Sequence, residues 1–278
     1  MSDASQGPFA IPRIKKEERS SLVLIDLPAL GIGTSSATEK LDPSAVKAAI
    51  LYAIRLAYTH FQTESSSYLE QLVGEAIAEA IGNGTVQSTD ELYITAKIRF
   101  TNGSSDSIVP NLKKSLQRLN LESVRIFLIE WPENGDTFSA DAFTSAWRAM
   151  EECQSLGLAK EIGVSNFSTE MLESLLGFAT SAPVANQIGM ERMWRDKKLR
   201  EYCSDNDIVI LVSAAVDGED KDFDYDQFME SEGLKIEKDG VLKTPAQVYF
   251  KWAYEQGAAV LLQSFNQQLM KEMLDIFR

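Results

Sequence analysis

Residues 124–131 read Val-Arg-Ile-Phe-Leu-Ile-Glu-Trp, and residues 161–167 read Glu-Ile-Gly-Val-Ser-Asn-Phe. Both are short apolar runs that end on polar residues, and the amphipathic stretch Phe143–Leu156 separates them. Two strands run parallel to each other when a helix connects them. The crossover through the helix returns the chain to the same edge of the sheet before the second strand begins. This stretch therefore predicts a parallel strand–helix–strand unit.

The same alternation recurs along the chain about every 30 residues, the length of one such unit. The predicted strands are Ala29–Thr34, Tyr58–Thr63, Leu92–Ile98, Val124–Trp131, Glu161–Phe167, Val184–Met190, Ile208–Ala215 and Ala259–Ser264. The predicted helices are Ala45–Leu56, Leu69–Ile81, Ile108–Leu119, Phe143–Leu156, Met171–Phe178, Lys197–Asn206, Pro245–Glu255 and Gln267–Phe277. Eight repeats indicate an α/β fold, the (β/α)8 TIM barrel, whose functional residues lie at the carboxyl ends of the strands.

The chain has 278 residues, a length that suits one barrel domain. Residues 1–27 are mostly polar and include the short apolar run Leu22–Ile25, so we expect a polar segment with a hairpin or plug. Residues 28–278 are expected to form the barrel.

Charge and composition exclude several classes of function. The net charge of −14 argues against nucleic acid and membrane surfaces as partners. Cys153 and Cys203 are interpreted as free thiols, and the amino terminus lacks an apolar signal segment, so we expect a cytoplasmic protein. The single histidine, His60, argues against multi-histidine zinc sites, and we expect no metal.

Several motifs resemble those of the aldo-keto reductase superfamily, in order from Pro28 to Phe277. They are Leu30–Thr34, His60–Thr63 (HFQT, where the family has HFDT), Ile94–Lys97, Leu128–Pro132 (LIEWP, similar to LIHWP), Gly163–Phe167 (GVSNF) and Ala185–Gln187. The segments Lys197–Cys203 and Trp252–Gly257 are similar to plant chalcone-reductase and codeinone-reductase-like members.

This resemblance implies NADPH-dependent carbonyl reduction by a tyrosine acid beside a lysine, a histidine and an aspartate. Lys97 matches the lysine, whereas Gln62 and Glu130 stand at the aspartate and histidine positions. Ser67 stands at the tyrosine position and Tyr68 follows it. Tyr68 replaces the tyrosine only if the preceding loop bulges by one residue; otherwise it packs at the start of a helix. Steroid 5β-reductases also carry glutamate at the position of Glu130, but they keep the tyrosine, so Glu130 alone is weak evidence for ene reduction.

The cofactor residues implied by the resemblance are partly replaced. Gln263 and Leu269 stand where the family has a lysine and an arginine for the 2′-phosphate, and losing two such contacts costs roughly two to four decades of affinity. The stretch Ser213–Val216 lacks the stacking aromatic residue, and the loop Asp217–Asp226 is strongly acidic. The residues that hold the carboxamide in the family remain, and we interpret them as a vestigial site; they are Ser165, Asn166 and Gln187, with Ser264. We therefore expect no cofactor, and NADPH only if the chain is a reductase.

Two further features bear on the substrate. The loop Glu133–Asp141 is short and the chain stops at Arg278, before the family's substrate-lining tail, so we expect a wide mouth. Trp131 and Ser67 are candidate substrate-binding residues.

Three functions remain open. In the first, the chain is a repurposed, redox-inactive protein of plant-type specialised metabolism that binds a small polyketide or alkaloid-like molecule. Lys97 and Glu130, with Tyr68 and Gln62 as orienting groups, would then catalyse isomerisation or cyclisation by proton transfer. A close Lys97–Glu130 pair would keep Glu130 ionised as a base, and a distant pair would leave it protonated as an acid.

The alternatives are a divergent NADPH-dependent carbonyl or enone reductase that uses Tyr68 and Lys97, and a non-catalytic partner of another protein.

Overall fold

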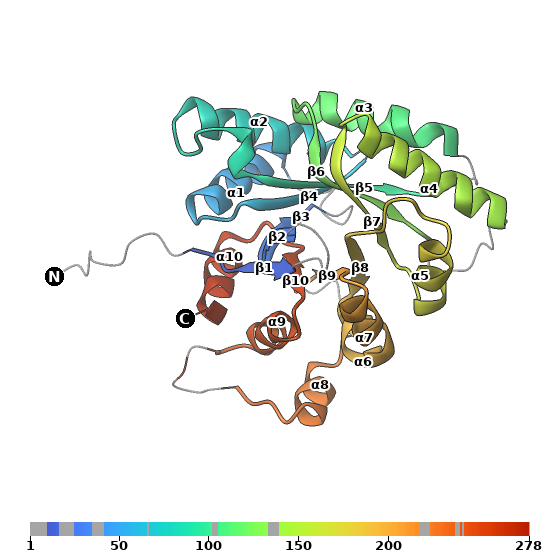
Figure 1. Cartoon of the computed structure of the whole chain (residues 1–278). Coiled ribbons are helices and arrows are strands. Elements are labelled where there is room, and N and C mark those ends of the chain that lie inside the picture. The colour runs from blue at the N-terminus through green and yellow to red at the C-terminus, as the bar shows by residue number, and fades with distance from the viewer. Residues whose placement is uncertain are drawn as a thin grey trace.

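A computed structural model describes residues 10–16, 25–34, 42–65, 67–101, 105–132, 139–216, 223–236, 240 and 242–277. Eight parallel strands close into a barrel in the order β10-β3-β4-β5-β6-β7-β8-β9, with helices on the outside (Figure 1). The strands are β3 (Leu30–Gly33), β4 (His60–Glu64), β5 (Tyr93–Arg99), β6 (Val124–Glu130), β7 (Ala159–Ser165), β8 (Ala185–Gly189), β9 (Val209–Ala214) and β10 (Ala259–Leu262). The predicted (β/α)8 fold is confirmed.

The helices that follow the strands cover the barrel. They are α1 (Pro43–Arg55), α2 (Leu69–Gly82), α3 (Ile108–Leu119), α4 (Ala140–Ser155), α5 (Thr169–Leu176), α6 (Met190–Arg195), α7 (Lys197–Asp205), α8 (Tyr225–Ser231), α9 (Pro245–Glu255) and α10 (Gln267–Met273). Short 3-10 turns are η2 (Thr89–Glu91), η3 (Ser105–Ser107) and η4 (Leu274–Phe277).

Local capping explains where these helices begin. Asp42 accepts a hydrogen bond from the backbone of Ala45 at the start of α1, and Pro43 takes the first helical position, where a missing N–H costs nothing. Thr244 and Gln247 form a reciprocal capping box at the start of α9. These signals fix the helix starts, and hence the lengths of the loops at the mouth of the barrel.

Two helices were missing from the sequence-based assignment. α6 and α8 have 6 and 7 residues, which is too short for an apolar period of 3.6 residues to stand out. The predicted helix Gln267–Phe277 is instead α10 followed by η4.

An antiparallel hairpin precedes the barrel, formed by β1 (Arg13–Lys16) and β2 (Ile25–Pro28). Ile14 and Leu27 pack with inward-facing apolar side chains of the barrel strands, so the hairpin covers the amino end of the barrel. His60 lies at this end, where it is fully buried and Nε2 lies 2.9 Å from Thr95 Oγ1. Burial, with a contribution from the charge of Arg13, lowers the pKa of His60 to about 3. The only histidine of the chain is thus a neutral residue away from the carboxyl ends of the strands.

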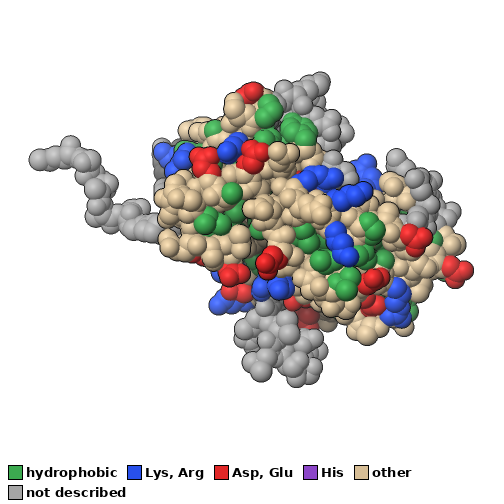
Figure 2. Space-filling view, turned by 90° about the horizontal axis from the view of Figure 1, so that it is seen from above, with side chains coloured by type: hydrophobic (Ala, Val, Ile, Leu, Met, Phe, Trp, Pro, Cys, Tyr) green, Lys and Arg blue, Asp and Glu red, His purple; other side chains and the backbone are tan. Residues whose placement is uncertain are grey.

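The outer surface is mixed in charge. Figure 2 shows both basic and acidic side chains on the face seen from above. Among the described residues no helix is long and apolar enough to cross a membrane.

The two glycines of α2 give a matched test of helix packing. A Cβ on Gly74 would lie 2.7 Å from the backbone oxygen of Arg118 in α3, whereas a Cβ on Gly82 would meet nothing within 4 Å. We expect Gly74→Ala to lower the free energy of unfolding by about 1–3 kcal/mol, because a backbone oxygen cannot move aside. Gly82→Ala should be neutral or stabilising by up to about 1 kcal/mol, since alanine favours helix. Urea unfolding measures both, and equal effects would contradict the close contact of α2 with α3.

Candidate active site at the barrel mouth

Four charged side chains form one cluster at the carboxyl ends of three neighbouring strands. Lys97 Nζ contacts Glu130 Oε2, and it lies 3.4 Å from Glu64 Oε1. Arg99 Nε donates to Glu130 Oε1 over 2.7 Å. The side chain of Glu130 is 8% exposed and that of Lys97 is 12% exposed, whereas Arg99 is 67% exposed. The pair is therefore enclosed, with Arg99 on its outer side.

Strand register brings these residues together. Glu64 is the last residue of β4 and is aligned with Lys97 of β5, and Arg99, the last residue of β5, is aligned with Glu130 of β6. Lys97 and Arg99 are two residues apart, so their side chains leave the strand on the same face. Glu130 thus receives a cation at each of its oxygens.

The electrostatics fix the protonation state of Glu130. Burial alone would raise the pKa of its carboxyl group, but the charges and hydrogen bonds of Lys97 and Arg99 bring this pKa below the usual 4.5. The carboxylate is therefore ionised near neutral pH. Of the two expectations for Glu130, the structure shows the close pair with Lys97, which keeps the carboxylate ionised.

Gln62 and Gln187 form a reciprocal amide pair inside the mouth. Gln62 Nε2 donates to Gln187 Oε1 over 2.5 Å, and Gln187 Nε2 donates to Gln62 Oε1 over 3.0 Å. β4 and β8, which carry them, are four positions apart in the ring of eight, so the pair spans the barrel. Gln62 was predicted as an orienting group for Lys97 and Glu130, and Gln187 as part of a vestigial cofactor site; in the structure the two side chains bond each other.

Ser165 is the last residue of β7 and Asn166 follows it, beside this amide pair. Ser165 is aligned with both Glu130 and Gln187 in the neighbouring strands. Asn166 has φ 67°, a left-handed conformation that asparagine adopts more readily than most residues, and its Nδ2 lies 3.4 Å from the backbone oxygen of Trp131. Ser165 Oγ and Asn166 Oδ1 have no hydrogen-bond partner among the described residues. A hydroxyl donor and an amide acceptor together complement a carboxamide such as that of nicotinamide.

The remaining predicted residues lie nearby but differ in environment. Ser67 Oγ accepts a hydrogen bond from the backbone of Leu69 and so supports the start of α2. The side chain of Tyr68, the residue before α2, is 41% exposed. Ser264 is buried, and its Oγ accepts from the backbone of Asn266.

Trp131 is half-buried in an aromatic cluster. Its ring stacks on Phe100 at 4.9 Å and meets Phe143 and Phe167 edge-on at 5.2 and 6.0 Å. An indole with three aromatic neighbours is held in a fixed orientation, which suits the predicted role as a wall of a binding site.

Sequence reasoning missed Glu64 and Arg99. Arg99 comes two residues after Lys97 in a predicted strand, so the alternation of side chains could have placed both on one face. Glu64 immediately follows the predicted strand Tyr58–Thr63, where side chains point into the mouth.

The opposite side of the mouth, at β9 and β10, is neutral where it is described. Gln263 Nε2 donates to Ser213 Oγ over 3.0 Å. Leu269, which stands where the resemblance places the phosphate-binding arginine, is a half-buried hydrophobic residue of α10. Residues 217–222 of the acidic loop and residues 133–138 of the predicted short loop lie outside the described residues. Within the described ranges there is no group of three or more histidine, cysteine, aspartate or glutamate residues that could hold a metal ion.

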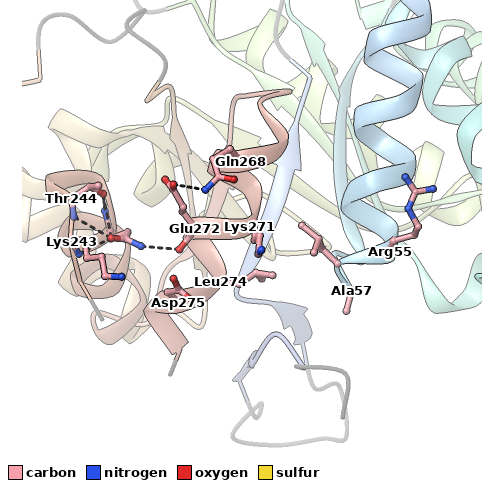
Figure 3. A pocket seen from close by; sticks show the side chains of 11 residues that line it. Arg55, Ala57, Lys243, Thr244, Gln268, Lys271, Glu272, Leu274 and Asp275 are labelled. Carbon is pink, nitrogen blue, oxygen red and sulfur yellow. Dashed lines mark hydrogen bonds between the residues drawn. The ribbon is translucent and has the colours of Figure 1, made fainter. Parts of the chain in front are cut away.

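A surface pocket of about 470 Å³ lies away from this cluster, between α1, α9 and α10 (Figure 3). It includes Ala57, which precedes β4, and therefore reaches the amino-end side of the barrel. Its cations do not converge, because Arg55 and Lys243 lie on opposite sides of the view (Figure 3). The cluster at the carboxyl ends of the strands is therefore the candidate active site.

The fold and the cluster together define a (β/α)8-barrel protein with a buried acid–base pair at its mouth. The family model described as "Aldo/keto reductase family" matches residues 29–278. The chain is 40% identical to the 7-acetyl-epi-neemfruitin B aldo-keto reductase of Melia azedarach, over 91% of this chain and 81% of the relative. It is 38% identical to deoxymugineic acid synthase 1 of Zea mays and 37% identical to the D-galacturonate reductase of Fragaria ananassa, over 90% of this chain and 82% of each relative. The chain belongs to the aldo/keto reductase family, as its motifs predicted.

Solved structures agree with this assignment. A silkworm (Bombyx mori) aldo-keto reductase superposes with a TM-score of 0.75 at 27% identity, covering 91% of this chain and 80% of that one. The same enzyme complexed with NADPH gives a TM-score of 0.74 at 26% identity, and a second silkworm aldo-keto reductase in complex with NADP gives 0.74 at 25% identity. The expectation that this chain takes no cofactor is contradicted by these relatives and was wrong. It gave too much weight to single replaced residues and too little to the retained Ser165 and Asn166.

The amide pair gives a testable coupling between β4 and β8. Gln62→Leu should lower the free energy of unfolding by about 1–3 kcal/mol, because it leaves the buried amide of Gln187 without a partner. Gln187→Leu should cost a similar amount, and the double variant should recover much of the loss. Urea unfolding of the four proteins completes the cycle, and strictly additive losses would contradict the pairing.

The lowered pKa of Glu130 predicts a pH-dependent contribution to stability. Because the folded-state pKa lies below 4.5, this contribution is present above that pH and is lost as the pH falls through the folded-state value. Urea unfolding of the wild type and Glu130→Gln from pH 7 to pH 3 should therefore show a stability difference that shrinks on acidification. A difference independent of pH would show that the folded state does not favour the ionised carboxylate.

Proposed function

We propose that this chain is a nicotinamide-dependent reductase of a small-molecule carbonyl or enone in plant-type specialised metabolism. The observation that carries the proposal is the enclosed contact of Lys97 with an ionised Glu130 beside Ser165 and Asn166. The names of the plant relatives support it, since two of them are reductases by name and a third is a synthase that makes a small acid.

The retained mouth residues suit a nicotinamide. A bound nicotinamide cofactor supplies a hydride. Ser165 Oγ would donate to the carbonyl oxygen of its carboxamide, and Asn166 Oδ1 would accept from the amino group. Arg192 donates to the backbone oxygen of Asn166 over 3.2 Å and so helps to hold this segment in place.

Lys97 is the proton donor in this proposal. Glu130 cannot donate a proton while it is ionised, whereas the ammonium group of Lys97 carries three protons. Glu130 and Glu64 hold Nζ from two sides, so one N–H remains to face a substrate oxygen on which negative charge develops. Such a fixed donor stabilises charge more than a mobile one, because no reorganisation is needed. The aromatic side chain of Trp131 forms a wall for an apolar substrate.

A second candidate uses the same pair without a cofactor. Ionised Glu130 can act as a base, and a base beside an ammonium group can catalyse isomerisation or cyclisation. Product formed from substrate alone, with no dinucleotide, would favour this candidate.

Substitution of the pair tests the reductase proposal. With NADPH or NADH and an aromatic aldehyde as the probe, we expect Glu130→Gln and Lys97→Met each to lower turnover roughly a hundredfold or more, the usual scale for a general acid or base. Dinucleotide absorbance measures the rate, and circular dichroism checks the fold of each variant.

Glu64→Gln is the matched control. It removes a carboxylate that contacts the same Nζ but leaves the Glu130 contact in place, so turnover should fall only a few-fold. Unchanged turnover in both Glu130→Gln and Lys97→Met would remove the proton role of the pair. Absence of any turnover in the wild type would leave binding or partnership with another protein as the better account.

A further inference from the structure

Arg99 presents a largely exposed cation at the mouth of the barrel. Its side chain is 67% exposed, whereas that of Glu130, to which its Nε donates over 2.7 Å, is 8% exposed. A molecule that enters the mouth therefore meets the guanidinium group before it meets the carboxylate. The proposed reduction gives this exposed charge no role beyond its contact with Glu130.

The strand fixes where this cation lies relative to Lys97. Alternate residues of β5 share one face, and Tyr93 of this set packs with the inward-facing apolar side chains of the barrel. Lys97 and Arg99 therefore both face the interior, with Arg99 about 6.6 Å further toward the mouth along the strand. The hairpin covers the amino end of the barrel, so a substrate whose oxygen lies at Lys97 Nζ extends toward Arg99.

The guanidinium group is held in place by its neighbours. Arg99 Nε and Lys97 Nζ contact the two oxygens of one carboxylate, that of Glu130. The backbone N–H of Phe100 donates to the backbone oxygen of Glu130 over 2.9 Å, so β5 and β6 stay bonded just beyond these side chains. The spacing of the two cations is thus set by shared contacts, and a donor held in this way loses less entropy when it binds a ligand.

The chemistry of the group favours a carboxylate as its ligand. A guanidinium group is planar and carries five N–H donors, so it can bond Glu130 and a second carboxylate at once. Among the described residues, Lys97 and Arg99 are the cations in the last three positions of a barrel strand. Glu130 and Glu64 already balance their two charges, so a singly charged carboxylate fits better than a doubly charged phosphate ester.

The charge of the whole chain makes such a cation necessary for an acidic substrate. The net charge of −14 opposes the approach of any anion, and a local positive group at the point of entry offsets this repulsion. We propose that Arg99 selects substrates that carry a carboxylate several bonds away from the carbonyl that is reduced. This inference rests on the proposed reduction and names the class of its substrate, an oxo acid.

Two aldehydes that differ in charge test the inference with the full-length chain. The carboxylate of para-formylbenzoate lies across the ring from the aldehyde, and para-formylbenzamide carries a neutral amide of similar size there. We expect kcat/KM of the wild type to be at least about tenfold higher for the acid, since charge-assisted hydrogen bonds correspond to roughly 10- to 100-fold in affinity. The difference should lie chiefly in KM, because the carboxylate stays bound from the substrate to the transition state.

Substitution of Arg99 separates recognition of the substrate from support of Glu130. Arg99→Gln should bring the acid-to-amide ratio of kcat/KM to about one. Arg99→Lys should keep part of the preference, because lysine retains the charge but not the planar fork. If Arg99 only supported Glu130, both aldehydes would lose the same factor and the ratio would not change. Titration calorimetry with the same two compounds measures the preference without turnover.

Arg55→Gln is the matched control. It removes the same charge from an exposed residue of α1 that lines the separate pocket of Figure 3, so the ratio should stay as in the wild type. An unchanged ratio in Arg99→Gln, or a wild type that prefers the acid in neither turnover nor binding, would overturn the inference while leaving the proposed reduction intact. Tighter binding of the acid that depends on Arg99, with no turnover of either aldehyde, would support selection by Arg99 and overturn the proposed reduction.

Discussion

The mouth of the barrel depends on one enclosed carboxylate, Glu130, between two cations. An ionised group so far from water is tolerated only because Lys97 and Arg99 each contact one of its oxygens. In turn, Glu130 fixes the ammonium group of Lys97, so position and charge are set together. Glu130 of β6 is also aligned with Ser165 of β7. The charged side of the mouth is therefore next to the polar residues at the end of β7. The proposed chemistry and the proposed ligand positioning would therefore rest on one set of contacts.

Much of the fold could be predicted because its signals are local. Each barrel strand is a short apolar run, and each long helix has an apolar face with a capping residue at its start, such as Asp42 or Thr244. α6 and α8 were not predicted, because one or two helical turns are too few to show the apolar period of a helix. His60 lies in a recognisable motif, but no local pattern indicates that the amino-end hairpin encloses it. The low pKa of His60 comes first from this burial and then from the charge of Arg13, more than forty positions earlier in the chain.

The sequence named residues of the candidate site but could not show how these residues contact one another. Lys97 and Glu130 were identified from their places at strand ends, but their separation depends on the register of β5 against β6. Gln62 and Gln187 were singled out separately, and their pairing follows from barrel closure, which brings β4 opposite β8. Arg99 and Glu64 were not predicted because neither residue occupies a position of a family motif. The cofactor expectation failed because replaced residues were counted and the intact remainder of the mouth was discounted.

The hairpin of β1 and β2 has a consequence for the order of events in catalysis. It covers the amino end of the barrel, and the amide pair of Gln62 and Gln187 crosses the interior beneath the mouth. Ligands therefore enter and leave from one side only. When two molecules occupy the mouth together, the deeper one must arrive first and depart last. Steady-state kinetics of such a site follow a compulsory order, and the release of the deeper molecule sets an upper limit on the rate at which the site becomes free again.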